Sequence, residues 1–231
     1  GLIGSLHDAD GRVAVPGFYD GLLPVHPAET EAAQALDADA EEWIRTAGAI
    51  RSAGETGLGP RERTWFRPTL EVNGASAGYT GDGIKTIVPS AASCKITARL
   101  VPGMDPAVTR GRIEEHVRRV LRGEAEVRVH AFAGSAQPFH ADVDGRVFEL
   151  ARQSLAAAFG RDVVPARDGG SIPVVPLLAA NSGTTVLLMN FGCPDENKHA
   201  PNEWLSLKNF RGGQETLVRL LLALGTEGRE R

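Results

Sequence analysis

The segment that most constrains this fold is an alternating strand followed directly by a helix. In SCKITARLV, residues 93–101, apolar or small residues alternate with polar ones. Because side chains alternate across a strand, Ile96 and Leu100 lie on one face and Arg99 on the other. A Pro-Gly pair ends the strand, and an apolar stripe at helical spacing predicts a helix over 106–121. The two elements together favour a layered domain that contains a sheet.

The sequence on both sides of this strand and helix predicts further helices, strands and loops. Apolar spacing predicts a helix over 30–46, and alternation predicts strands over 70–73 and 127–131. The Asn73-Gly74 pair is a turn signal that should end the first of these strands. Long polar or Gly-rich loops are expected over 8–27, 48–64 and 78–83. The order helix, strand, strand, helix, strand favours a small α+β sandwich.

The pattern changes after residue 138, where we place a domain boundary. A helix is expected to end at Gly160, and TTVLLMNF, residues 184–191, is a continuous apolar run typical of a strand buried on both faces. A final helix over 210–224 should be closed by Gly225. This second part indicates α/β layering with too few strands for a complete sheet.

Composition excludes several classes of function. The net charge of −4 offers no basic face for nucleic acid. Apolar runs are far shorter than the roughly 18 residues of a membrane span. Two cysteines, Cys94 and Cys193, form no disulfide framework, which favours a reducing, cytoplasmic location. The opening GLIGSL resembles the end of a helix in progress, so we expect a piece of a longer polypeptide.

Candidate functional residues lie in four places, each with a simpler alternative. His199 follows the apolar run in a polar loop, where it could bind a metal with Asp195, Glu196 or Glu203 nearby, or be a solvated histidine. Arg99 could bind a carboxylate through two hydrogen bonds, or be an exposed sheet residue. These local patterns do not decide between the alternatives.

The segment RDGGSIP, residues 167–173, places two glycines and Ser171 before an apolar stretch. Gly170 permits close backbone approach, and Ser171 could cap a helix, although an ordinary turn explains both. Thr86, in IKTIVP, is a β-forming residue that we expect in a strand, where it needs no special role.

Three blocks taken together resemble the dinuclear zinc dipeptidases of the carnosinase and cytosolic non-specific dipeptidase type. They are YTGDGIKTIVPSAASCKITARLVPGMDP, ARDGGSIPVVP and FGCPDENKHAPNEWLSLKNF. More distantly, they are similar to deacylases of acetylornithine and succinyl-diaminopimelate. The resemblance implies an α/β catalytic domain with two zinc ions, for which manganese or cobalt is an alternative, and a ferredoxin-like α+β lid that usually forms a homodimer.

The resemblance also implies roles for individual residues. His199 matches the last metal-ligand histidine, and Arg99 matches the arginine that holds the substrate carboxylate. Ser171, with Gly170 beside it, matches a residue lining the substrate site. Thr86 matches a lid threonine contributed across the dimer. The family's other ligands and its general base match nothing here, so no catalytic residue is assigned and the chain alone is expected to be inactive.

We therefore predict a lid domain over 1–138, without its first strand, joined to an incomplete α/β catalytic segment over 139–231. The expected function is hydrolysis of dipeptides, or of similar amide bonds next to a free carboxylate. A non-catalytic dimerisation module and an N-acyl amino acid deacylase are the alternatives. The expected partners are a small peptide or N-acyl amino acid substrate and a second copy of the chain.

Overall fold

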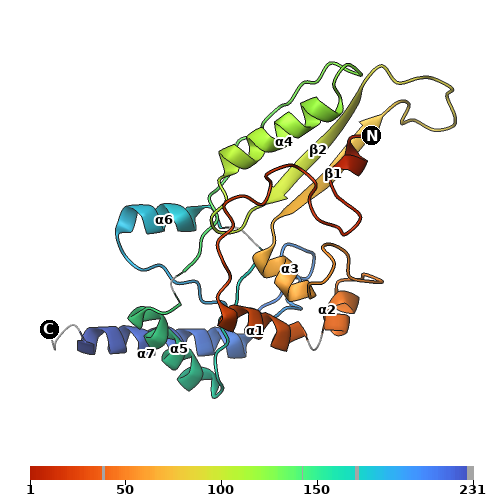
Figure 1. Ribbon diagram of the computed structural model, residues 1–231. Coiled ribbons are helices and arrows are strands. Elements are labelled where there is room, and N and C mark those ends of the chain that lie inside the picture. The colour runs from red at the N-terminus through yellow and green to blue at the C-terminus, as the bar shows by residue number, and fades with distance from the viewer. Residues whose placement is uncertain (38–39, 142, 170–171, 228–231) are drawn as a thin grey trace. The chain divides into compact units, whose positions relative to one another are not determined.

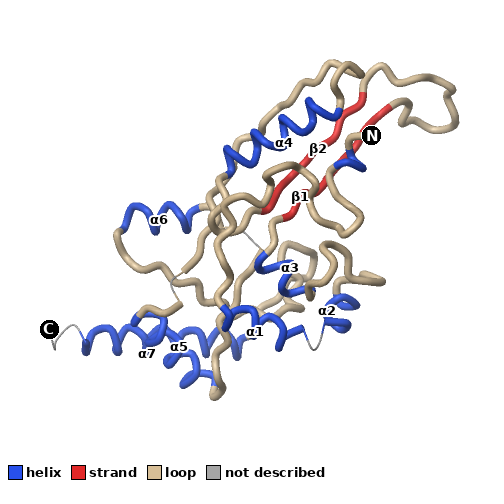
Figure 2. Tube along the Cα trace, in the orientation of Figure 1, coloured by secondary structure: helices blue, strands red, loops and turns tan. Residues whose placement is uncertain are grey.

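A computed structural model describes residues 1–37, 40–141, 143–169 and 172–227. The chain divides into two compact units. The first contains Gly1–Phe139 with Ala166–Pro176, and the second contains His140–Pro165 with Leu177–Arg231. The segment 166–176, which precedes and includes part of a helix, therefore packs with the first unit. Elements are labelled in Figure 1, and Figure 2 separates helices, strands and loops.

An antiparallel hairpin forms the sheet of the first unit. Strand β1 (Thr69–Ala77) pairs with β2 (Ala92–Arg99), with Thr69 opposite Arg99 and Ala77 opposite Ala92. Along β2, partly buried and exposed residues alternate as the sequence predicts. Helix α4 (Pro106–Val120) follows, and Asp105 caps it by accepting hydrogen bonds from two backbone N–H groups of its first turn.

The predicted end of β1 at Asn73-Gly74 is wrong. The register shifts between Val72, which pairs with Ile96, and Gly74, which pairs with Lys95. Asn73 is therefore the extra residue of a β-bulge, and its Oδ1 accepts a hydrogen bond of 2.7 Å from Thr97 Oγ1 on the opposite strand. A bulge keeps the strand paired where a turn would have reversed it.

The core of the first unit draws heavily on the N-terminal loop. Short helix η1 (Ile3–Ser5) leads into a segment that contains Leu6 and Phe18, both fully buried, together with Leu70 of β1. Ile113 of α4 and the inward residues of β2 pack against this cluster. A loop rich in Gly and Pro thus supplies one wall of the core behind the hairpin.

Three helices replace the single helix predicted over 30–46 and the loop predicted over 48–64. They are α1 (Pro27–Leu36), α2 (Ala40–Thr46) and α3 (Pro60–Phe66). Asp37 follows α1, and its carboxylate accepts hydrogen bonds from the backbone N–H of Arg61. One of the free N–H groups at the start of α3 is thus satisfied by a side chain distant in sequence.

Two helices dominate the second unit. Helix α5 (Arg146–Phe159) ends at Gly160 in the left-handed conformation, φ 68°, as predicted. It packs on α7 (Leu207–Glu227) around Leu150, Ala151 and Leu220, and α7 runs past Gly225, where it was expected to end. A Cβ at Gly212 would lie 2.5 Å from the Phe159 ring, so glycine permits this close packing.

Two predicted strands are wrong. Residues 127–131 lie in the described part of the chain but do not form a strand, and neither do residues 184–191. In the latter, Leu187 and Met189 pack on the core of the second unit while Leu188 is 58% exposed. The run therefore has one covered face, and none of the described segments pairs with it. Helix α6 (Val174–Ser182) completes the described elements, none of which is a helix long and apolar enough to cross a membrane.

His116 connects α4 to the N-terminal segment. Its Nδ1 lies 2.9 Å from Arg119 Nη2, and its Nε2 lies 2.9 Å from Ser5 Oγ. A guanidinium only donates, so Nδ1 accepts and the neutral ring donates from Nε2 to Ser5. Burial, followed by the neighbouring Arg119 charge, lowers the pKa of His116 below its ordinary value.

We expect the free energy of unfolding to fall as the pH drops below about 6.5, because unfolded His116 takes up a proton that the folded ring resists. This loss should level off once the pH is below the lowered pKa of the folded state. His116→Gln can still accept from Arg119 and donate to Ser5, so it should flatten this part of the profile. Urea melts across this pH range measure the effect, and an unchanged slope in the variant would assign it to other groups.

Candidate functional site

Arg99 and the RDGGSIP segment come together in the first unit. Arg99 is the last residue of β2 and lies on its exposed face. Its Nη1 donates to the carbonyl oxygen of Gly169 at 3.4 Å, across 70 residues of sequence. The structure thus joins two of the predicted site segments at the open end of the hairpin. The contact is long and exposed, so it is weak.

The backbone just before Gly169 is held by a buried ion pair. Arg167 donates from Nε to Glu29 Oε1 at 2.7 Å and from Nη2 to Glu29 Oε2 at 2.6 Å. The two side chains are only 15% and 5% exposed, and the guanidinium lies 5.3 Å from the Phe66 ring centroid. This pair fixes the segment against α1 and α3.

Sequence reasoning missed the ion pair. Glu29 sits at the third position of α1, where its carboxylate accepts a hydrogen bond from the His26 backbone N–H as part of a capping box. Because capping already explains a carboxylate at this position, the local sequence gives no reason to expect its pairing with Arg167. The one available signal was the combination of a carboxylate in the first turn and an arginine beside a glycine pair.

Gly169 has a steric reason to be glycine. A Cβ at this position would lie 3.0 Å from the carbonyl oxygen of Thr64 in α3. The close approach lets the segment pass directly over α3. Gly170 and Ser171, the predicted substrate-lining residues, lie outside the described residues, so their roles stay predictions.

Thr86 lies in the loop that joins β1 to β2, outside any strand, contrary to the expectation of a strand there. Figure 1 shows this loop extending beyond the end of the hairpin. Arg99 is at the other end, separated by the seven-residue step from Ala92. At about 3.4 Å per residue, the strand alone spans about 24 Å. Within one copy, Thr86 and Arg99 therefore do not contact the same small ligand.

His199 lies in an exposed loop of the second unit that has unusual backbone geometry. Asn197, His199 and Asn202 all have positive φ, at 52°, 65° and 62°. Residues other than glycine rarely adopt positive φ, so we expect other contacts to hold the backbone of this loop. Trp204 provides two of them, donating from Nε1 to Asp195 O at 2.8 Å and from its backbone N–H to Glu196 O at 3.1 Å.

Glu196, of the acidic residues considered near His199, is the buried one, at 4% exposed, and its Oε1 has no hydrogen-bond partner among the described residues. Asp195 and Glu203 are exposed. In the part of the chain that the structure describes, no three His, Cys, Asp or Glu side chains gather as a metal site would require. His199 and these residues do not by themselves fit a zinc site, which needs at least three protein ligands.

Comparison with known proteins finds a family model and several relatives. Residues 2–125 match the family model M20_dimer, described as a peptidase dimerisation domain. The Beta-Ala-His dipeptidase of Rattus norvegicus is 27% identical over 225 residues, which cover 96% of this chain and 46% of that protein. The Cys-Gly metallodipeptidase DUG1 of Saccharomyces cerevisiae is 26% identical over 227 residues, or 95% of this chain and 46% of that protein. The chain thus spans about half the length of the curated relatives it matches.

Solved structures of similar proteins share the fold. The di-peptidase Dug1p of Saccharomyces cerevisiae has a TM-score of 0.77 at 25% identity, covering 95% of this chain and 46% of that one. The M20 family metallo-carboxypeptidase Sso-CP2 of Sulfolobus solfataricus has a TM-score of 0.78 at 27% identity, covering 95% and 50%. Both superpose nearly the whole chain.

Breaking the buried pair should destabilise the first unit. We expect Glu29→Gln to lower the free energy of unfolding by about 3–5 kcal/mol, because it leaves the Arg167 guanidinium buried without its charged partner. Glu215→Gln, in the half-exposed pair with Arg219, is the matched control and should cost under about 1 kcal/mol. Urea melts of both variants test this, and equal costs would show that the Arg167 pair is not special.

Zinc should bind this chain weakly. His199 is the one residue expected to be a ligand, and sites with a single histidine are poor. After incubation with zinc and dialysis, elemental analysis should find well below stoichiometric metal. Near-stoichiometric zinc that resists a chelator would reveal ligands not recognised among these residues.

Proposed function

This chain belongs to the M20 peptidase family through its dimerisation domain, and we propose that it forms part of a zinc-dependent metallopeptidase. Its substrates would be dipeptides, or similar amides next to a free carboxylate. The names of the relatives support this class, since they include dipeptidases that act on β-Ala-His and Cys-Gly. The N-acyl amino acid deacylase and the purely dimerising module remain the alternatives to be tested.

The observation that carries the proposal is the contact between Arg99 and Gly169. It places a guanidinium, which has no second acceptor among the described residues, beside the segment predicted to line the substrate. A neutral carbonyl at 3.4 Å is a weak acceptor, whereas a carboxylate accepts two short, charge-assisted hydrogen bonds from the same fork. A substrate carboxylate would therefore displace the carbonyl, and binding there would position the neighbouring amide bond.

His199 would supply one metal ligand in the complete enzyme. Its loop is fixed in an uncommon conformation by the Trp204 contacts, which suits a residue that must hold one orientation. Among the described residues, no group of three His, Cys, Asp or Glu side chains gathers to hold a metal ion.

A homodimer formed through residues 1–138 would complete the site. Thr86 and Arg99 lie at opposite ends of one hairpin, so both could serve one substrate if Thr86 came from a second copy. The hairpin backed by α4 supports a ferredoxin-like lid in this region. Two free thiols, Cys94 and Cys193, support a cytoplasmic location.

Arg99→Ala should lower kcat/KM for a free dipeptide roughly 10- to 150-fold in the active enzyme that contains this chain. The loss corresponds to one charge-assisted contact of about 1.5–3 kcal/mol. Folding should be unaffected, because Arg99 is on the exposed face of β2. Arg99→Lys should recover part of the activity, since an ammonium lacks the planar fork.

The control is Lys95→Ala, a cation on the same exposed face of β2. It should leave turnover unchanged. The decisive comparison uses a dipeptide and its C-terminal amide: Arg99→Ala should slow the acid much more than the amide. If both substrates slow equally, the carboxylate role is wrong and Arg99 is a structural residue of the strand.

A further inference from the structure

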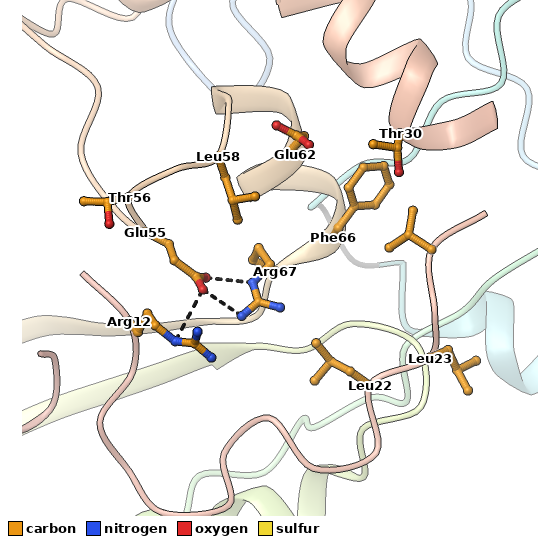
Figure 3. Close-up of a pocket in the computed structure, with 11 residues that line it drawn as sticks. Arg12, Leu22, Leu23, Thr30, Glu55, Thr56, Leu58, Glu62, Phe66 and Arg67 are labelled. Carbon is orange, nitrogen blue, oxygen red and sulfur yellow. Dashed lines mark hydrogen bonds and ion pairs between the residues drawn. The ribbon is translucent and has the colours of Figure 1, made fainter. Parts of the chain in front are cut away.

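A second feature of the first unit points to a ligand. A cavity of about 500 Å³ opens beside α3 and the N-terminal loop (Figure 3). This volume lies within the range of small-molecule pockets, about 300–1,000 Å³. All of its lining residues belong to the first unit.

One end of the cavity has two arginines for one carboxylate. Arg67 donates from Nε and Nη2 to Glu55 at 2.7 and 2.8 Å, and Arg12 Nε lies 3.5 Å from Glu55 Oε1. Tyr19 orders both cations, with ring-centroid distances of 5.1 Å to Arg12 and 4.6 Å to Arg67. The cluster of Arg12, Glu55 and Arg67 therefore has a net positive charge.

The cluster keeps donors for a ligand. Arg12 is half exposed, and among the described residues its terminal Nη groups have no acceptor, since only Nε faces Glu55. Glu62, also on the wall, lies apart from the cluster in Figure 3. Its carboxylate accepts hydrogen bonds from Gly59 N and Gln34 Nε2. A second anion would thus meet unused guanidinium donors on Arg12 without a carboxylate in front of them.

The other end of the cavity is lined mainly by apolar side chains, with Thr30 and Glu62 near them. Leu22, Leu23, Val25, Leu58 and Phe66 line it. Figure 3 shows Leu22, Leu23 and Phe66 on the side away from Arg12. The pocket therefore matches a molecule with an anionic head and an apolar body.

We propose that this cavity binds a small organic carboxylate, with its head group on the free Nη groups of Arg12 and its apolar body beside Leu22, Leu58 and Phe66. The site stands independently of the peptidase function proposed above, because none of its residues is assigned a role there. Binding should depend on both halves of the ligand.

Isothermal titration calorimetry with 4-phenylbutyrate tests the proposal on the full chain. The acid should bind saturably, and its neutral amide should bind at least about tenfold more weakly, as expected for the loss of a charge-assisted contact. Inorganic phosphate, which lacks the apolar body, should also bind more weakly than the acid. Equal affinities for acid and amide, or no saturable binding, would overturn the site.

Two variants change the cluster charge in opposite directions. Arg12→Gln should weaken the acid at least about tenfold, while Glu55→Gln should tighten it, since one counter-charge is removed. Arg110→Gln, an exposed α4 arginine outside the cavity, is the matched control and should change nothing. Thermal melts verify folding. Unchanged affinity in Arg12→Gln, or weaker affinity in a Glu55→Gln variant that melts like the parent, would overturn the proposal.

Discussion

The buried pair between Arg167 and Glu29 is the interaction on which the candidate site of the first unit depends. It joins segments 138 residues apart through two short hydrogen bonds in a site that water barely reaches. The exposed contact from Arg99 to Gly169 is too weak to order that backbone by itself. A strong buried contact therefore sets the position of the segment, while a weak exposed one leaves Arg99 able to exchange its partner. A binding residue requires both: a fixed neighbouring backbone and a side-chain contact that a ligand can replace.

In the first unit, some arginines stabilise the packing and others remain available to bind an anion. Arg167 and Arg67 are largely buried and engage a carboxylate with two donors each, so they stabilise the packing around α3. Arg99 and Arg12 are more exposed and use one nitrogen on a protein acceptor. The planar fork has five donors, so partial engagement leaves capacity for an anion. Buried arginines thus stabilise the fold, while exposed arginines keep hydrogen-bond donors at the surface.

The elements that the sequence predicted well are those determined by local periodicity. The helix ending at Gly160 and the alternation along β2 depend on residues within a few turns of one another. The strand expected over 184–191 failed because a strand needs a paired neighbour, which a local pattern does not contain. The Asn73-Gly74 pair indicated a turn, whereas Asn73 is the extra residue of a bulge within a strand that continues. In the site, alternation along the strand placed Arg99 on the exposed face. The contact of Arg99 with Gly169 spans 70 residues of sequence, and the ion pair of Glu29 with Arg167 spans 138, so a local pattern contains neither. The roles of Arg99, Ser171 and His199 came from family resemblance, because spacing alone left them open.

The glycines at the start of α7 have a consequence for how the second unit opens. A Cβ at Gly212 would meet the Phe159 ring at 2.5 Å, and one at Gly213 would meet Phe191 at 3.1 Å; the two rings stack at 6.3 Å. Each glycine makes the free energy of helix formation about 1 kcal/mol less favourable than alanine would. The first turns of α7 therefore depend for their stability on the two rings that cover them. Amide hydrogens there should become exchangeable only when α5 and the Phe191 segment separate from α7. Three stretches of chain, far apart in sequence, would then open as a single cooperative unit.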